Sequence, residues 1–304
     1  MKLSHLRDIA AVAERGSLRA AARHLGIAQP AITRSIREIE RELGVALFER
    51  RPRGVVLTPM GELFLARAVT ILGELRRARE EIDQARGAAT GEVTIALSPA
   101  AQISLLPNAL PAFRKRYPEV SVSIRDGLFP SVEGPLKGGE LDFYVGPLPE
   151  VTPAKDFVTE KLFDNTRVIV GRKDHPLAGA RSLADLTQAR WVSTSVTMDS
   201  GAELGPLFER YGLPAPIVEL HVTAGVSLMP TVASTDLLLM APEQFLNLSL
   251  GRNNLAVIQV AEPLPAPTVC IVTRARLPLT PAAQHFVDLF RRAAENYVRS
   301  RKVG

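Results

Sequence analysis

The chain has 304 residues, of which 46 % are hydrophobic and 23 % charged, a balance typical of a globular protein with room for two or three domains. Its single cysteine, Cys270, excludes an internal disulfide and a cysteine-based metal site, and this fits a reducing, cytoplasmic compartment. Charged residues interrupt the apolar positions from Met1 to Glu14, and no apolar stretch is long enough to span a membrane. We therefore expect neither a secretory signal nor a membrane-spanning segment.

The net charge of +5 is concentrated at one end of the chain. Residues 1–57 carry eleven Lys and Arg against six Asp and Glu, whereas the two signs balance in the rest of the chain. A basic surplus on one small module favours a polyanionic partner, although a solvated face would have the same composition.

The first 60 residues have the periodicity and caps of short helices. Apolar residues from Leu6 to Ala13 recur at helical spacing, and Ser17 can cap a second helix over Leu18–Leu25. A third helix is predicted over Gln29–Leu43, and the segment 50–57, with a Pro and a Gly before three apolar residues, predicts a short β wing.

Thr58 and Pro59 begin a long helix that is predicted to end near Arg86. Its stripe repeats every three or four residues, through Gly61, Leu65, Ala68, Leu72, Leu75, Arg79 and Ile82. Such a stripe favours dimerisation through a coiled-coil-like seam, and packing of the helix on its own domain is the alternative. Small residues from Gly87 to Gly91 form a predicted hinge.

Beyond Glu92 short apolar strands alternate with helices, which predicts mostly parallel sheets covered by helices on both faces, in two sub-domains. The predicted strands are Val93–Leu97, Val120–Ile124, Leu141–Val145, Val168–Val170, Trp191–Val192, Ile217–Val222, Leu237–Met240, Val257–Val260 and Val269–Thr273.

Four stretches of the N-terminal sequence carry a close family resemblance: Gly16-Ser-Leu-Arg-Ala-Ala-Ala-Arg-His-Leu-Gly-Ile-Ala-Gln-Pro-Ala-Ile-Thr-Arg34, Ile36-Arg-Glu-Ile-Glu-Arg-Glu-Leu-Gly44, Leu47-Phe-Glu-Arg50 and Leu57-Thr-Pro-Met-Gly61. With these stretches the chain closely resembles the LysR-type transcriptional regulators. Later segments such as Gly139-Glu-Leu-Asp142 and Asp174-His-Pro-Leu177 agree with that family's sensing domain.

The resemblance implies an α/β protein with an all-α winged helix-turn-helix N-terminal domain, a long linker helix and two Rossmann-like sub-domains resembling a periplasmic binding protein. The expected domains are residues 1–58 (DNA binding), 59–91 (linker, dimerisation and hinge) and 92–304 (effector binding). Sub-domain I would comprise about 92–162 and 267–304, and sub-domain II about 163–266. The chain would cross between them near Glu160–Phe163 and Pro263–Thr268.

The implied function is a sequence-specific, DNA-binding transcription regulator whose activity is modulated by a small organic effector, for example a carboxylate. Its partners would be double-stranded promoter DNA, RNA polymerase and further copies of itself in a dimer of dimers, with no membrane partner. The alternative is a DNA-binding regulator or architectural protein without an effector. Two departures from the family stand out: Ala28 replaces a usual capping serine, and Phe129 aligns with a small hydroxyl residue of the sensing cleft.

In a helix-turn-helix the second helix presents its N-terminal residues to base edges in the major groove. Residues expected there are Gln29, Pro30, Ala31, Thr33 and Arg34, because Gln can pair with adenine and Arg with guanine. Ser35 and Arg37 are expected to reach phosphates, and Arg50, Arg51 and Arg53 the backbone or minor groove from the wing. Alternatively, Arg34 and Arg37 solvate an exposed face and pair with Glu38 or Glu40.

Ligands of doubly wound sheets bind beyond the carboxyl ends of the strands, often at a helix N-terminus. The free backbone N–H groups of the segment 98–102 and the Ser98 hydroxyl are expected to hold an anionic or carbonyl oxygen. The full set of candidate effector residues is Ser98, Pro99, Ala100, Gln102, Phe129, Ser131, Gly146, Pro147, Ser193, Thr194, Ser195, His221, Thr223 and Ala224. No hydrolase, zinc-protease or nucleotide-binding motif is present, so no enzyme activity, cofactor or metal site is predicted.

Overall fold

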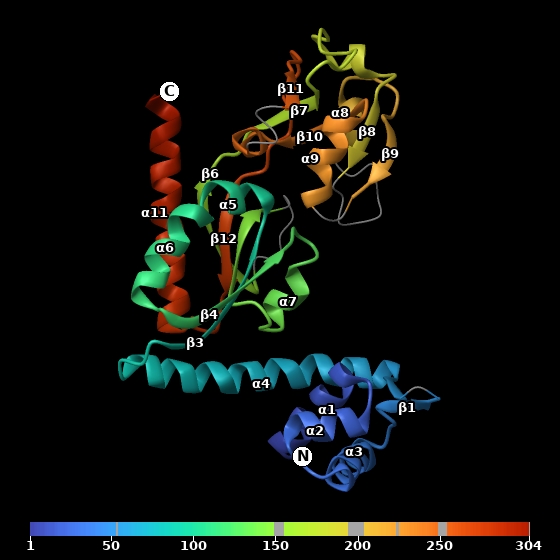
Figure 1. The fold of residues 1–304 in the computed structure, drawn as a ribbon, viewed down its shortest axis with the longest axis vertical. Coiled ribbons are helices and arrows are strands. Elements are labelled where there is room, and N and C mark those ends of the chain that lie inside the picture. Colours follow the sequence, from blue (N-terminus) through green and yellow to red (C-terminus); the bar gives the residue numbers. More distant parts are fainter. Residues whose placement is uncertain (53, 149–154, 194–203, 223–224, 249–253, 304) are drawn as a thin grey trace. The chain divides into compact units, whose positions relative to one another are not determined.

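The computed structural model describes residues 1–304 except 53, 149–154, 194–203, 223–224, 249–253 and 304 (Figure 1). The described chain forms two compact units. One holds Met1–Ala88 with Pro135–Leu141, and the other holds Ala89–Gly134 with Asp142–Gly304.

The N-terminal unit is built from helices with a small two-stranded wing (Figure 1). Its elements are α1 (Leu3–Arg15), α2 (Leu18–Leu25), α3 (Gln29–Leu43), β1 (Phe48–Arg51), β2 (Gly54–Leu57) and α4 (Pro59–Ala85). The Ser17 side chain accepts a hydrogen bond from the Ala20 amide at the start of α2, whereas Ala28 gives α3 no side-chain cap. The predicted helices and wing are thus confirmed, and the core between them is formed by side chains such as Ile9, Val12 and Ile39.

The start of α4 is fixed to the preceding loop. The Thr58 side chain accepts a hydrogen bond from the Gly61 amide (3.0 Å) and donates one to the Ala46 carbonyl (2.7 Å), while its own amide donates to Leu47 (2.9 Å). A Cβ on Gly61 would lie 2.0 Å from the Leu47 carbonyl oxygen. Only glycine can therefore bring the helix this close to the loop.

In the first turns of α4, residues of the predicted seam pack against the helix-turn-helix core of the same unit. Ala68 is fully buried and Leu65 packs against the helix-turn-helix core, as the own-domain alternative requires. Other large apolar side chains on α4 are solvent-exposed and share one face of the helix with Ile82 of the predicted stripe: Met60, Leu63 and Ile71.

The C-terminal unit contains two five-stranded sheets. Sheet I has the order β4-β3-β5-β12-β6 and sheet II the order β11-β7-β10-β8-β9. The strands are β3 (Thr90–Leu97), β4 (Glu119–Asp126), β5 (Phe143–Pro147), β6 (Phe157–Phe163), β7 (Arg167–Arg172), β8 (Arg190–Ser193), β9 (Ile217–His221), β10 (Leu237–Pro242), β11 (Leu255–Ile258) and β12 (Val269–Arg274). The helices are α5 (Pro99–Ser104), α6 (Leu106–Arg116), α8 (Leu204–Arg210), α9 (Gly225–Ser234), α11 (Pro281–Val303) and the 3-10 helices η1 (Leu183–Leu186) and η2 (Glu243–Asn247). Helix α7 (Glu133–Lys137) begins in this unit, and its residues from Pro135 onward belong with the N-terminal unit.

The prediction of mostly parallel sheets is wrong for the strands at the crossings. Pairs β3–β4, β3–β5, β8–β9 and β8–β10 are parallel, whereas β5–β12, β6–β12, β7–β10 and β7–β11 are antiparallel. Strands β7 and β12 each begin directly after a crossing, at the edge of the sheet where neighbouring strands end. They are therefore antiparallel to those neighbours. Strand β6, which the sequence treats as a crossing only, is a full edge strand beside β12.

Apolar side chains from the sheets meet those of the covering helices in separate cores. Helices α6 and α11 lie side by side against sheet I (Figure 1), where Phe113 stacks on Phe286 at 4.4 Å between ring centroids. In sheet II, Trp191 is fully buried against Phe208 on one face, and α9 supplies Leu228 to a core on the other. The strands are therefore held rigidly and their carboxyl ends are fixed in space.

Candidate DNA-reading helix and effector cleft

The exposed face of α3 carries a row of arginines. Ile32, Ile36 and Ile39 bury the opposite face, so Arg34 and Arg37 point away from the core. The residues that line a shallow groove along this face are Gln29, Pro30, Thr33, Arg34, Arg37, Glu38 and Arg41. Ala31 is also exposed, and the Thr33 hydroxyl donates to the Gln29 carbonyl at 3.0 Å. Arg41, which the sequence reasoning missed, lies four residues beyond Arg37 and so continues the row.

The acidic residues of α3 are engaged elsewhere. Glu40 accepts hydrogen bonds from the amides of Leu47 (2.8 Å) and Phe48 (3.2 Å), and Glu38 lies 3.4 Å from the His5 ring. No described residue forms an ion pair with Arg34 or Arg37. The alternative in which Glu38 and Glu40 neutralise these arginines is therefore wrong.

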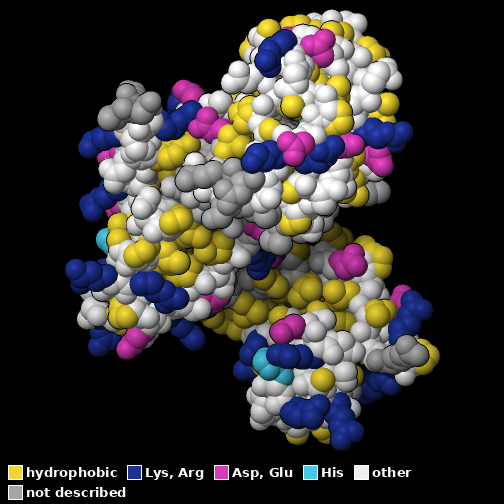
Figure 2. All heavy atoms as spheres, turned by 45° about the horizontal axis from the view of Figure 1, so that its top comes forward, with side chains coloured by type: hydrophobic (Ala, Val, Ile, Leu, Met, Phe, Trp, Pro, Cys, Tyr) yellow, Lys and Arg dark blue, Asp and Glu magenta, His cyan; other side chains and the backbone are white. Residues whose placement is uncertain are grey.

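Lys and Arg side chains gather on the exposed surface of the N-terminal unit (Figure 2). Arg50 and Arg51 are exposed on the wing, and Arg51 pairs with Glu49 at 2.9 Å. Arg53 lies outside the described residues. The expected phosphate contact of Ser35 is wrong, because Ser35 is buried on the core side of α3.

A large cleft of about 1120 Å³ opens in the C-terminal unit. It lies where strands β3, β4 and β5 end and where both crossings between the sheets pass, as expected for a doubly wound architecture. Helices α5, α8 and α9, strand β10 and the 3-10 helix η2 contribute most of the remaining walls. The cleft is therefore built by elements of both sheets.

Half of the predicted effector residues line this cleft: Ser98, Pro99, Ala100, Gln102, Phe129, Ser131 and Pro147. Among the described residues, Gly146, Ser193 and His221 do not line it. A Cβ on Gly146 would lie 2.1 Å from the Tyr144 hydroxyl, so packing inside sheet I explains this glycine. Thr194, Ser195, Thr223 and Ala224 lie outside the described residues.

The sequence reasoning missed most of the wall formed by the crossings and by sheet II. The missed residues are Ile103, Asp126, Gly127, Leu128, Leu148, Asn165, Arg167, Pro206, Leu207, Arg210, Val222, Leu228, Met229, Leu239, Met240, Ala241, Pro242, Phe245, Leu248, Pro265, Ala266, Pro267, Thr268 and Cys270. The segment 265–268 falls inside the predicted second crossing, so that crossing was a usable signal for part of this wall.

The start of α5 offers an anion fewer donors than the sequence suggests. Pro99 has no N–H group, and the amides of Ala101 and Gln102 donate to the side chain and carbonyl of Ser98 at 3.3 and 3.0 Å. This leaves Ala100 as the one amide of 99–102 that these bonds do not occupy. The prediction of several free N–H groups is wrong, because Ser98 caps its own helix.

The Gln102 side chain binds Asp126 across the end of sheet I. Its Nε2 donates to the Asp126 carboxylate and to the Leu97 carbonyl (3.3 Å). This amide ties the ends of β3 and β4 together and gives the Asp126 carboxylate a donor inside the protein.

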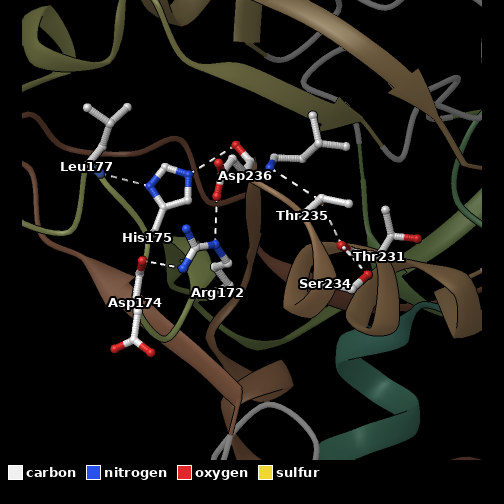
Figure 3. A network of polar contacts seen from close by, with 9 residues as sticks. Arg172, Asp174, His175, Leu177, Thr231, Ser234, Thr235 and Asp236 are labelled. Atoms are coloured by element: carbon white, nitrogen blue, oxygen red, sulfur yellow. Dashed lines mark hydrogen bonds and ion pairs between the residues drawn. The ribbon is translucent and has the colours of Figure 1, made fainter.

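Polar contacts connect the segment 174–177, which follows β7, with Asp236, which precedes β10 (Figure 3). One ring nitrogen of His175, Nδ1, accepts a hydrogen bond from the Leu177 amide (3.0 Å), and Nε2 faces the Asp236 carbonyl (3.0 Å). Arg172 donates to the Asp236 carboxylate at 2.6 Å. Both ring nitrogens are therefore occupied, and this buried histidine fixes the link between α9 and β10.

Two negative observations apply to the described part of the chain. None of its helices is long and apolar enough to cross a membrane. Its His, Cys, Asp and Glu side chains form no group of three or more that could hold a metal ion.

Two protein families match the chain in order. The bacterial regulatory helix-turn-helix protein family of the lysR type matches residues 3–62, and the LysR substrate binding domain family matches residues 86–295. Similar proteins include the "HTH-type transcriptional regulator TdcA" of Escherichia coli (strain K12), 28 % identical over 95 % of this chain and 92 % of that protein. The "SDS degradation transcriptional activation protein" of Pseudomonas sp. (strain ATCC 19151) is 31 % identical over 93 % of each chain.

Solved structures show the same fold. The full-length regulator CbnR in complex with its target DNA superposes with a TM-score of 0.71 at 23 % identity, over 96 % of this chain and 100 % of that chain. The C199D variant of full-length OxyR from Pseudomonas aeruginosa gives a TM-score of 0.66 at 24 % identity, over 96 % of this chain and 98 % of that chain. With its N-terminal helix-turn-helix and its two-sheet substrate-binding unit, the chain belongs to the LysR family of DNA-binding transcription regulators.

Proposed function

We propose that this regulator reads its operator with the exposed row of α3. The single observation that carries the proposal is that Arg34 and Arg37 are exposed and form no ion pair with a described residue, while Glu40 accepts a backbone hydrogen bond and Glu38 lies 3.4 Å from the His5 ring. Gln29, Pro30, Ala31, Thr33 and Arg34 would face base edges, and Arg37 would contact phosphate. From the wing, Arg50, Arg51 and Arg53 would contact the backbone or minor groove.

The proposed division of labour follows the two family domains. Residues 1–58 would bind DNA, residues 59–91 would link and dimerise, and residues 92–304 would bind a small organic effector in the cleft. Ser98, Pro99, Ala100, Gln102, Phe129, Ser131 and Pro147 would contact that molecule. The effector must bind two arrangements of the regulator with different affinity, because equal affinity shifts no equilibrium. No catalytic step, metal or cofactor is part of this proposal.

Self-association supports the same function. Met60, Leu63, Ile71 and Ile82 expose a row of large apolar side chains on one face of α4, and such a face favours a second copy of the helix. A dimer would place two reading helices on two half-sites, and a dimer of dimers would extend that contact. RNA polymerase is the proposed further partner on the promoter.

The test is binding of the purified protein to the DNA upstream of its own gene at two salt concentrations. Arg34→Ala should weaken specific binding by about 1–3 kcal/mol, the usual worth of one arginine contact to a base. Arg299→Ala is the matched control, because Arg299 is exposed on α11 and lies outside the DNA-binding unit. If the wild type bound random DNA as tightly as the upstream DNA, or if Arg34→Ala left the affinity unchanged, an architectural protein would be favoured instead.

A further inference from the structure

The walls of the cleft are chiefly apolar. Sub-domain II contributes Leu228 and Met229 from α9, Met240 from β10 and Phe245 from η2, and the second crossing contributes Cys270 at the start of β12. A ligand that fills such walls gains its free energy from removing apolar surface from water. A small, highly hydrated molecule would leave much of this apolar surface in contact with water.

Phe129 makes the opposite wall rigid and apolar. Its ring lies 5.4 Å from that of Tyr144 and 6.0 Å from that of Phe157, edge to face in both cases. The Tyr144 hydroxyl donates to the Pro147 carbonyl at 3.1 Å, which leaves that hydroxyl committed within the protein. The Phe129 ring therefore gives the cleft an apolar surface on this side.

The charged side chains of the cleft have a positive balance. Arg167 and Arg210 line it together with one acid, Asp126, which already accepts a hydrogen bond from Gln102. Arg210 stands at the end of α8 and forms no ion pair or hydrogen bond with a described residue. A guanidinium in this position suits a carboxylate, because its planar donors match the two carboxylate oxygens.

We propose that the effector is an organic acid with an extended apolar body, and that Phe129 and Arg210 determine this specificity. The inference rests on the proposed role of the cleft as the effector site and narrows the class of its ligand. The apolar body packs against the Phe129 wall and the acid group pairs with Arg210. A cleft of about 1120 Å³ has room for a body larger than that of a short dicarboxylic acid.

The experiment measures the melting temperature of the full-length protein with three sets of probes at equal concentration. Octanoate and 4-phenylbutyrate are apolar acids with a chain and a ring, their primary amides are neutral matches, and malate and citrate are polar acids. We expect the two apolar acids to raise the melting temperature, the amides to raise it less, and the polar acids to leave it unchanged.

Two variants locate the effect. Phe129→Ser should weaken the binding of the apolar acids by about tenfold, the contribution of a partly buried aromatic contact. Phe129→Leu should restore most of the lost affinity. Arg210→Met should abolish the difference between each acid and its amide. Emission of Trp191 at the wild-type wavelength confirms that each variant is folded, because Trp191 is fully buried in the same unit as Phe129 and Arg210.

The outcomes separate the inference from the function on which it rests. Stabilisation by malate or citrate, and not by the apolar acids, would overturn the ligand class and keep the effector cleft. Amides that bind as well as the acids, in wild type and in Arg210→Met alike, would overturn the role of Arg210. If no probe of any set moved the melting temperature while specific DNA binding persisted, the ligand class and the effector role of the cleft would both be overturned.

Discussion

Cys270 shows how the surroundings of one side chain set its chemistry. Its thiol lies at the wall of the effector cleft, is buried, and contacts the Thr268 carbonyl at 3.8 Å. Burial raises the pKa of this thiol, the Lys161 ammonium opposes that shift, and the Asp164 carboxylate adds to it. Tyr144 stands on the neighbouring strand, and burial raises the pKa of its phenol, so it supplies no charge at neutral pH.

We expect Cys270 to react slowly with iodoacetamide. Only the thiolate attacks, and a raised pKa lowers the thiolate fraction at every pH below it. At pH 7.5 the rate constant should be at least about tenfold below that of N-acetylcysteine, and it should climb toward the rate of the free thiol as the pH rises. Because the chain has no other cysteine, the mass of the labelled protein reports this site alone.

The matched control for this labelling is the same protein in concentrated urea, where the two thiols should react alike. Native labelling as fast as that of N-acetylcysteine at pH 7.5 would contradict a buried thiol of raised pKa.

At the scale of elements, the sequence predicts helices better than strand directions. The bounds of α2 and α3 follow from local signals: Ser17 caps α2, and apolar residues repeat along one face of α3. The direction of β12 depends instead on where the chain re-enters sheet I, and no local pattern in Val269–Thr273 encodes that. Strand β6 is not predicted as a strand for the same reason: it forms by pairing with β12, which lies far away in the chain.

The same distinction explains the candidate sites. Local order along α3 is enough to predict which of its residues are exposed, because one helix supplies them all. The cleft wall is drawn from many elements, and side chains such as Arg210 and Phe245 reach it only through tertiary packing. Ser98 was placed correctly at the wall, yet its hydroxyl is committed to the Ala101 amide, a detail of helix capping that competes with ligand binding.

Helix α11 and the 3-10 helix η2 are joined by a buried polar network. Gln244 is fully buried, and its Nε2 donates to the Tyr297 hydroxyl and to Asn165 Oδ1, both at 2.9 Å. The Tyr297 hydroxyl in turn donates to Glu243 at 3.3 Å, and Arg301 pairs with Glu243 at 2.6 Å. Since Asn165 lines the cleft, the network ties the cleft wall to the last helix.

Tyr297→Phe should lower stability by about 1–3 kcal/mol, the cost of leaving one N–H of the buried Gln244 amide without an acceptor. Tyr117→Phe is the matched control, because Tyr117 also stacks in the sheet I core and its hydroxyl forms no hydrogen bond with a described residue. The measurement is urea unfolding of both variants at pH 7, well below the pKa of Tyr297, which burial raises. Equal stability of the two variants would show that the network contributes little.

At the scale of the whole molecule, the chain divides into two units with separate cores. The main boundary falls at Ala88–Ala89, after α4, and the strands that line the cleft all lie beyond it; the short segment Pro135–Leu141 belongs with the N-terminal unit. The apolar clusters behind the cleft contain no residue of the helix-turn-helix. The cleft and the exposed face of α3 are thus built on independent cores that share no residue.

Residues 89–304 should accordingly fold when produced alone and keep the cleft. Trp191, the one tryptophan of the chain, is fully buried against Phe208, so the fragment should emit at the short wavelength of an apolar environment and shift to the red in urea. An apolar acid that stabilises the full-length protein should stabilise the fragment to the same extent, because every described residue of the cleft belongs to this unit. A fragment that folds and yet has lost the response would place part of the binding free energy in the N-terminal unit, and the two functions would then share more of the chain than their cores do.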